Sequence, residues 1–571
     1  MTRRSSRPLA LIVTLLALAL AGCSGVPTSG PVTRASAAPG RVNPGVEIAP
    51  APPGLDATPI EVVEGFLHAM ASWQPNYAVA RAYLTEDASS RWRPDAGVRI
   101  YAQGNPVVAT DSGAMLRAPV VGTLDAAGAY RQSAGMLSHD FGLVLDARGQ
   151  WRVGNPPDGL VISEYLFSSA FARVTAYFFA PGGGWLVPDP RYFPRGAQAR
   201  EGAARAVLGG ATEWLAPSVG GAHPGALLDR VDLSPAGVVQ VVLRKGANDL
   251  GDAERVALTA QLVWTFRQFE SVVGVQIAWR GEEPWLIAPY GRSIPVTAFP
   301  EADPTDRQAS RQLFAVMGGR LVRATEGPQG MDNLVVAPGV TNASLAAVRS
   351  DALLAAAVVD DRSGLVLAPL GEPDVSPLGG SVGLRRPHFD RRGDLWVVND
   401  AGAMALVSVD ASWREVAVAG LGEGRVEAFR VAPDGARMAL VVQRPTGQRA
   451  VGLARVVRGA DGAVSLEGWR ELTVTTSSVG PANVLDVGWR APDSLLVLVA
   501  DGRTTTVLAV AQDGSTVAPI GPSTTPDLVE LAVAPGVPPM VRAANGDVWR
   551  YNSDFRWSLH TSGVASAFYP G

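Results

Sequence analysis

The sequence predicts two α+β units followed by an all-β domain of the propeller type. The chain of 571 residues exceeds what one hydrophobic core normally supports, so several domains are expected. Between residues 58 and 300, apolar residues at helical spacing alternate with strand-like runs, a pattern typical of α+β units. From residue 308 onward, short apolar runs recur between turns of Gly, Asp and Pro, which is typical of an all-β repeat.

The N-terminal segment predicts a signal peptide over residues 1–22. Three arginines, at positions 3, 4 and 7, precede an apolar run from Leu9 to Ala21. As a helix, this run of about 13 residues rises only roughly 20 Å, which is short of the ~30 Å hydrocarbon core of a bilayer. The segment is therefore expected to be an export signal that is removed, not a permanent membrane span.

Cys23, the only cysteine of the chain, is the predicted attachment point to the membrane. It follows Leu20, Ala21 and Gly22, and these four residues match the lipobox of bacterial lipoproteins. Two or more acyl chains anchor a protein stably, so we expect a lipid anchor on the extracytoplasmic face of the cell membrane. A single cysteine also excludes intramolecular disulfides and cysteine-based zinc clusters.

Residues 23–57 are expected to form a flexible tether behind the lipid. They are rich in Pro, Gly, Ser and Ala and carry no periodic apolar pattern, which is typical of a linker. A tether of roughly 34 residues reaches about 30–35 Å on average. The folded part is thus expected to stand off the membrane and to search laterally.

Residues 58–168 predict the first α+β domain. Thr58 and Pro59 have the residue types of a helix N-cap and first turn, and apolar residues follow at helical spacing up to Met70. A short helix near residues 77–84 and strands near residues 98–101, 120–124, 129–132, 140–145 and 151–153 are expected next. This order resembles the cone-shaped α+β domains of the nuclear-transport-factor-like class.

Residues 172–300 predict the second α+β domain. Its expected strands cover residues 174–179, 185–188, 238–243, 272–279 and 285–287, and its expected helices cover residues 199–215 and 252–269. Three consecutive glycines, Gly182 to Gly184, could suggest a phosphate-binding loop, but such a loop opens a helix. Because a strand follows here, a hairpin turn is the better interpretation.

Several motifs of this second domain resemble a known family. Tyr177-Phe178-Phe179, Leu186-Val187-Pro188 with Arg191, and Trp214-Leu215-Ala216-Pro217 are similar to those of GerMN domains. The run Ala-Gln-Leu-Val-Trp-Thr-Phe-Arg-Gln over residues 260–268 resembles the version in actinobacterial LpqB lipoproteins. The lipobox before it and the repeated strands after it follow that family's order, which implies a GerMN domain and a C-terminal β-propeller.

Residues 308–571 predict the β-propeller. Similar phrases recur over residues 345–359, 387–398, 429–442, 485–499 and 531–541, at intervals of roughly 40–57 residues that suit four-stranded blades. The clearest phrase is Ala432–Val442, a Pro-Asp-Gly turn followed by a buried strand. With the strand pair near residues 318–322, five or six blades are expected; a β-sandwich is the alternative.

No constellation for catalysis, a metal or a cofactor is evident in the sequence. The five histidines, at positions 68, 139, 223, 388 and 560, are far apart, and no Gly-x-Ser-x-Gly turn or Gly-Lys phosphate loop occurs. His139-Asp140 and the glycine-rich segment 420–424 are interpreted as ordinary strand and connection residues. The acidic pairs Asp360-Asp361 and Asp390 with Asp394 are interpreted as turn residues, although a propeller glycosidase would need two such carboxylates.

The sequence therefore predicts a binding protein rather than an enzyme. The net charge of -4, from 49 basic and 53 acidic residues, gives no footprint for nucleic acid. Any exposed member of Trp214, Trp264, Trp279 and Trp285 is a candidate interface anchor. The resemblance to LpqB lipoproteins implies an adaptor for the extracytoplasmic domain of an envelope sensor histidine kinase, in MtrAB-like two-component signalling that affects cell envelope and division.

Two alternatives from other classes stay open. One is a lipoprotein that binds a cell-wall component or a solute, which a pocket lined by Trp and carboxylates would favour. The other is a propeller-type hydrolase, for which paired carboxylates in the central channel would be the structural sign.

Overall fold

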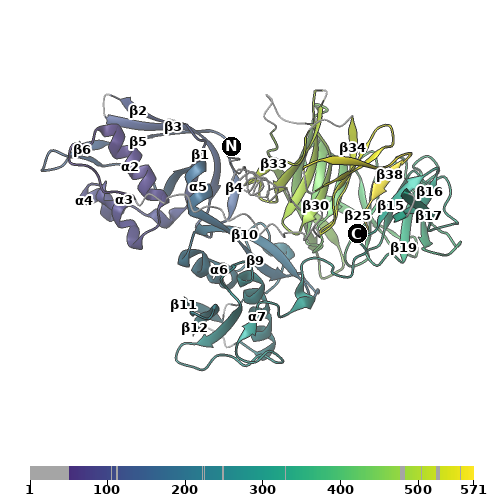
Figure 1. The fold of residues 1–571 in the computed structure, drawn as a ribbon, viewed down its shortest axis with the longest axis horizontal. Helices are drawn as coiled ribbons and strands as arrows, with labels where there is room; N and C mark the ends of the chain where they lie inside the picture. The colour runs from purple at the N-terminus through teal and green to yellow at the C-terminus, as the bar shows by residue number, and fades with distance from the viewer. Residues whose placement is uncertain are drawn as a thin grey trace, which may run out of the picture. The chain divides into compact units, whose positions relative to one another are not determined.

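The computed structural model describes residues 50–571 except 105, 111–112, 222, 224, 247–249, 328–329, 476–482, 503, 523–526 and 553–554. The predicted signal peptide, the lipobox, Cys23 and the tether up to residue 49 lie outside the described residues. In Figure 1 the first domain is purple and blue, the second blue and teal, and the last part teal to yellow. Within the described ranges, no helix has both the length and the apolar character needed to cross a bilayer.

The first domain opens with the predicted helix. Helix α2 spans Pro59–Ala71, and its N-terminus is closed by a capping box. The Thr58 hydroxyl accepts from the Glu61 N–H at 3.4 Å, and Glu61 Oε2 accepts from the Thr58 N–H at 2.8 Å. The Thr58 N-cap is thus confirmed. Short helices follow, namely η1 (Pro75–Tyr77), α3 (Ala78–Ala82), α4 (Glu86–Arg91), η2 (Pro94–Ala96) and, after the sheet, α5 (Glu164–Ala170).

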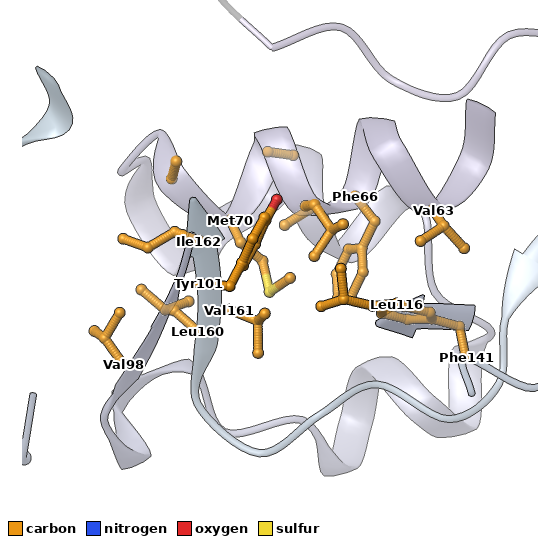
Figure 2. Close-up of a cluster of buried hydrophobic side chains, with 14 of the residues drawn as sticks. Val63, Phe66, Met70, Val98, Tyr101, Leu116, Phe141, Leu160, Val161 and Ile162 are labelled. Atoms are coloured by element: carbon orange, nitrogen blue, oxygen red, sulfur yellow. The ribbon is translucent and has the colours of Figure 1, made fainter. Parts of the chain in front are cut away.

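A twisted sheet completes this domain, and helix α2 covers it. The long strand β3 pairs with β1, β2, β4 and β5, and β1 pairs in parallel with β8. The bounds are β1 Val98–Tyr101, β2 Val107–Thr110, β3 Gly113–Leu124, β4 Tyr130–Gln132, β5 Met136–Asp140, β6 Leu143–Leu145, β7 Trp151–Val153 and β8 Leu160–Ser163. Figure 2 shows Phe66 and Met70 of α2 gathered with Leu116 and Val161 of the sheet, and both α2 side chains are fully buried.

Two strands of the first domain differ from the prediction. The strand expected over residues 120–124 begins earlier, since β3 spans Gly113–Leu124. The single strand expected over residues 140–145 is divided, because β5 ends at Asp140 and β6 begins at Leu143. Gly142 takes a φ of 55°, and its N–H donates to Asp140 Oδ1 at 2.9 Å. This local turn replaces the strand ladder. The hairpin of β6 with β7 is present as predicted.

The second domain is a hairpin and a four-stranded sheet with two helices. Helices α6 and α7 pack on one another and on β9. The bounds are β9 Phe171–Phe179, β10 Leu186–Pro194, α6 Ala197–Gly209, η3 Ala216–Ser218, β11 Ala226–Leu233, β12 Val238–Lys245, α7 Asp252–Phe266, β13 Gly274–Trp279, β14 Ile294–Pro295 and η4 Pro300–Ala302. The triple glycine lies in the β9–β10 turn, where Gly182 has a φ of 62°, so the hairpin interpretation is confirmed.

Two predicted elements of the second domain need correction, and one strand was missed. Helix α6 ends at Gly209 rather than near residue 215, because Gly210 takes a φ of 88°, which favours a helix stop. Residues 285–287 form only one isolated bridge, between Ile287 and Gly291. Strand β11 was not predicted, since most of its side chains are partly or fully exposed and the apolar alternation is weak.

Among the described residues, the last part consists of six four-stranded units, two of which are joined in one eight-stranded sheet. The first three are β15 Leu313–Met317, β16 Arg320–Gly327 and β17 Gly330–Val335 with β38 Ser566–Phe568; β18 Leu345–Val348, β19 Leu354–Val359, β20 Gly364–Pro369 and β21 Ser376–Gly380; and β22 His388–Phe389, β23 Leu395–Val398, β24 Met404–Val407 and β25 Trp413–Val418. The others are β26 Arg425–Val431, β27 Arg437–Gln443, β28 Arg449–Arg458 and β29 Val464–Leu472; β30 Asn483–Ala491, β31 Ser494–Asp501, β32 Thr504–Ala511 and β33 Val517–Pro519; and β34 Leu528–Ala532, β35 Met540–Ala543, β36 Val548–Tyr551 and β37 Trp557–Thr561.

Strand β38 closes this propeller. It pairs antiparallel with β15, so Phe568 lies opposite Phe314. The first strands of successive units contact one another around a ring, from β15 through β18, β22, β26, β30 and β34 to β38. Radial repetition of this kind leaves only short sheet edges, whereas a sandwich would stack two sheets.

Candidate functional site

Charged residues line a cavity of about 340 Å³ at one mouth of the propeller channel. The inner strands β22, β26, β30 and β34 and the residues just before them supply most of this lining. The charged members, which we call the channel cluster, are Arg362, Arg385, Arg386, Glu427, Arg430, Asp486, Glu530 and Arg542. A propeller-type hydrolase would need paired carboxylates at this mouth.

Two carboxylates of the channel cluster, Asp486 and Glu530, do lie close together. Arg386 donates to Glu530 Oε1 at 2.7 Å, and its Nη2 lies 3.9 Å from Asp486 Oδ2. A retaining or inverting glycosidase needs such a pair, with one carboxyl free to protonate the leaving group and one free for the sugar or a water. The partners of each carboxylate therefore decide what the pair can do.

Asp486 is held by groups of the protein itself. Its Oδ1 accepts from Arg430 Nη2 at 3.2 Å, and its Oδ2 accepts from the Leu531 N–H at 2.9 Å. Burial raises the pKa of Asp486, and the nearby Arg386 charge opposes that rise. The carboxylate thus links strand β30 to strand β34 of the next unit.

Glu530 is saturated in the same way. Its Oε1 accepts from the Ser566 hydroxyl at 2.7 Å, and its Oε2 accepts from Arg542 Nε at 2.7 Å and from the Ala567 N–H at 3.2 Å. Ser566 and Ala567 belong to the closing strand β38. The two channel carboxylates therefore fasten the ring, and neither has an oxygen atom free of protein donors for a sugar or a water.

The channel cluster carries an excess of positive charge. Each of its carboxylates, and Asp400 beside it, pairs with two or three arginines; for example, Glu427 lies within 2.9–3.6 Å of Arg385, Arg425 and Arg449. In total, seven arginines form ion pairs with four carboxylates. The carboxylates are Asp400, Glu427, Asp486 and Glu530, and the arginines are Arg362, Arg385, Arg386, Arg425, Arg430, Arg449 and Arg542. Three positive charges are left over, on a chain whose net charge is -4.

The histidines lie in separate parts of the fold. His68 is on α2, His139 on β5, His388 on β22 and His560 on β37, whereas buried His223 hydrogen-bonds Gln261. Burial, followed by the Arg386 charge, lowers the pKa of His388 to about 3. Across the described part of the chain, no group of three or more His, Cys, Asp or Glu side chains is placed to hold a metal ion.

The acidic pairs named from the sequence are structural. Asp390 accepts from Trp396 Nε1 at 3.0 Å, and it shares Arg458 with Asp394 at 2.7 and 2.8 Å. Burial raises the pKa of Asp390. Asp360-Asp361 lies in the turn between β19 and β20, and residues 420–424 connect β25 with β26. These positions agree with their interpretation as turns and connections.

The tryptophans of the second domain divide into two groups. Trp264, Trp279 and Trp285 are buried in the core of that domain. Trp214 is half-buried, and its Nε1–H donates to the Gly468 carbonyl of the propeller at 2.5 Å. Trp214 is thus an anchor, but for a contact within the chain rather than for another protein.

A second tryptophan, which sequence reasoning missed, also contacts the propeller. We call this contact region between the second domain and the propeller the junction. Trp185 follows the triple glycine, and its Nε1–H donates to the Asp434 carbonyl at 2.7 Å. The guanidinium carbons of Arg391 and Arg392 lie 4.4 and 5.5 Å from its ring centre, which adds cation–π attraction. The sequence signal that could have indicated this contact is an aromatic residue directly after a glycine-rich turn.

The Pro-Asp-Gly turn of the clearest repeat lies at the centre of this junction. Arg437 is fully buried, pairs with Asp434 and Gln512, and donates to the Pro492 carbonyl at 2.8 Å. Its guanidinium carbon lies 5.2 Å from the Trp489 ring centre. The turn was expected to connect strands only; its neighbour Ala436 in addition packs against the second domain.

Further polar contacts tie the first two domains to the propeller. Arg173 pairs with Asp493 at 2.6 Å, and the Tyr192 hydroxyl hydrogen-bonds Asp513 at 3.1 Å. Gln132 of the first domain accepts from the Thr473 N–H at 2.7 Å. Residues 50–571 accordingly form one compact unit. Long-range pairs of this kind leave no periodic trace in a sequence.

Comparison with known proteins agrees with this architecture. Residues 52–168 match the family model of the lipoprotein LpqB N-terminal domain, residues 175–284 match a domain described as sporulation and spore germination, and residues 319–570 match the lipoprotein LpqB beta-propeller domain. The solved structures are more distant. A Lactobacillus plantarum protein covers 45% of this chain and 98% of its own at 13% identity and a TM-score of 0.30, which is too low to support an argument.

Relatives match over nearly the whole chain. A protein of Cutibacterium acnes named lipoprotein LpqB is 32% identical, with 99% of both chains covered. One of Streptomyces coelicolor with the same name is 30% identical over 100% of this chain and 98% of its own. One of Mycolicibacterium smegmatis is 27% identical over 86% of both. The chain therefore belongs to the LpqB lipoprotein family.

Proposed function

We propose that this protein is a lipid-anchored adaptor on the extracytoplasmic face of the cell membrane. In this proposal it binds the extracytoplasmic domain of a sensor histidine kinase and modulates MtrAB-like two-component signalling, and so cell envelope and division. The lipobox ending at Cys23 and the lipoprotein names of the relatives support the anchor. No catalytic role is proposed, because the channel carboxylates are saturated by the protein.

The arginine excess at the channel mouth is the observation that carries the binding role. Five arginines and three carboxylates line an open cavity of about 340 Å³, and this excess of positive charge creates a local field opposite in sign to the net charge of the chain. Such a field attracts an acidic protein surface and raises the rate of encounter. An arginine that shares its carboxylate with another arginine also keeps N–H donors for a second acceptor.

The tether explains how a weak contact could suffice. A lipid confines both partners to one membrane, and a linker with a reach of about 30–35 Å keeps their binding surfaces at a high effective concentration. The junction contributes to affinity in a different way, because it holds the domains together. Binding surfaces on domains that are held together lose less entropy on binding than surfaces on separate domains would.

The test is co-purification from native membranes. Cells carry the full chain and the tagged kinase, and we expect the kinase to capture the wild-type protein. Arg425 and Arg449 contribute to the charge excess with side chains 50% and 33% exposed, so the variant R425Q/R449Q should fold. It should bind about three- to tenfold less. Arg117→Gln, an exposed position on β3, is the matched control.

Two results would contradict the proposal. One is that the kinase captures no more wild-type chain than an unrelated lipoprotein in the same membranes. The other is that R425Q/R449Q and Arg117→Gln bind alike at low salt. Cys23→Ala separates the anchor from the contact, since it should reduce capture in cells but leave binding between purified proteins unchanged.

A further inference from the structure

A second cavity, of about 250 Å³, lies where all three domains meet. Tyr130 and Arg131 of strand β4 line it from the first domain, Glu213 and Trp214 from the second, and Arg470 of strand β29 from the propeller. We call it the junction pocket. This volume lies just below the usual range of ligand pockets, so only a small molecule would fit.

Most charged groups of the junction pocket are already satisfied. Asp189 accepts from the Thr212 N–H at 2.7 Å and pairs with Arg191 at 2.8 Å. Asp513 accepts from the Tyr192 hydroxyl at 3.1 Å. Asp125 accepts two backbone N–H groups at 2.9 Å each. These side chains hold the walls together, as the buried Arg437 network does.

Two arginines of the pocket are different. Among the residues that the structure describes, the guanidinium groups of Arg131 and Arg470 have no hydrogen bond or ion pair with the protein. Arg470 is half-buried, and its guanidinium carbon lies 5.0 Å from the ring centre of Trp214. Burial, followed by the Arg131 charge, lowers the pKa of Arg470, and the Asp513 and Asp189 charges oppose that fall. Two like charges from different domains thus line one cavity, and in the described part of the chain neither forms an ion pair with the carboxylates that also line it.

We propose that the junction pocket binds a small organic anion whose carboxylate or phosphate group is held by Arg131 and Arg470. Guanidinium groups bind both oxyanions through paired N–H donors. Trp214 supplies an apolar face for the remainder of the molecule. Glu213 is exposed and lies at the rim of the pocket. Such a ligand would touch all three domains, so its binding would stabilise their junction.

The experiment uses the full-length Cys23→Ala chain, purified in a zwitterionic buffer at constant ionic strength. Calorimetry measures binding of inorganic phosphate, N-acetylmuramic acid and N-acetylglucosamine, and the last is a near match without the carboxylate. We expect saturable binding of at least one of the two anions and none of the neutral sugar. Tighter binding of inorganic phosphate would show that the site prefers phosphate, and tighter binding of N-acetylmuramic acid would show that it prefers a carboxylate.

Variants then locate the site. Arg131→Gln changes an exposed side chain and should weaken binding about tenfold, as should Arg470→Gln, whereas Arg117→Gln should bind like wild type. If Arg470→Gln fails to fold, Arg131→Gln alone carries the comparison. Absence of binding to both anions at millimolar concentration, or equal binding by Arg131→Gln and Arg117→Gln, would overturn the assignment. Neither result depends on the kinase, so the adaptor proposal is tested separately.

Discussion

Replacing Arg437 by Met should open the junction between the second domain and the propeller. Arg437 and Asp434 are 0% and 1% exposed, so the substitution leaves a carboxylate buried without its cation. Removing one partner of a buried ion pair costs about 3–5 kcal/mol. Since 1.4 kcal/mol corresponds to about a tenfold change in an equilibrium constant, local opening should become roughly 100- to 4000-fold more frequent.

Hydrogen exchange measured by mass spectrometry can detect this opening. The reporter amides are Ala436, which donates to Asp434 Oδ1 at 2.9 Å, and Val456, which donates to the Ala436 carbonyl at 2.8 Å. Peptides that contain them, and the Trp185 peptide, should exchange faster in Arg437→Met. The double variant Asp434→Asn/Arg437→Met should recover most of the protection, because no uncompensated charge is then buried.

The control is Arg414→Met, which removes an exposed arginine of strand β25 and should leave exchange unchanged. Unaltered exchange of the turn in Arg437→Met would refute the reasoning, and so would a double variant as open as the single one. The first result would mean that the apolar contacts of Trp185 and Trp214 hold the junction without the ion pair.

Three further predictions concern stability. The pKa of His388 is lowered to about 3 in the folded chain from about 6.5 when unfolded, so the unfolded chain binds the extra proton between these values. The free energy of unfolding should therefore fall as pH falls from about 6.5 to 3, by up to ~1.4 kcal/mol per pH unit. The urea midpoint of His388→Gln should fall less over this pH range than that of the wild type. Phe66→Ala empties a fully buried site and should cost about 3–5 kcal/mol, seen as faster exchange in α2 but not in the exposed-site control Tyr165→Ala. Glu530→Ala leaves the Ser566 hydroxyl and the Ala567 N–H without their acceptor, so limited proteolysis should release strand β38 faster than from wild type.

Features that depend on neighbouring residues were predictable from the sequence. The Thr58 cap and the apolar stripe of α2 are set within one or two helical turns, and both were found. The repeated phrases identified the propeller because each unit must bury the same alternating strands. Errors arose where glycine conformation decided the outcome, as at Gly142 and Gly210, since a glycine does not itself reveal which way it turns.

The junction and the two cavities were not predictable in the same way. Arg173 and Asp493 are separated by 320 residues, and no local pattern indicates that they pair. Arg131 and Arg470 each look like an ordinary strand residue, and only the packing of three domains makes them neighbours of one cavity. The four tryptophans were recognised as important, but their division between core and junction required the fold.

Strand β38 makes the propeller dependent on its last residues. Phe568 must return to Phe314 across the whole intervening chain before the first blade is complete, and closing so long a loop is slow and entropically costly. The ring therefore stays open until the C-terminal strand is available to pair. Until then the edge of β15 lacks its partner strand and can pair with other exposed strands, so the open ring is expected to aggregate more readily than the closed one.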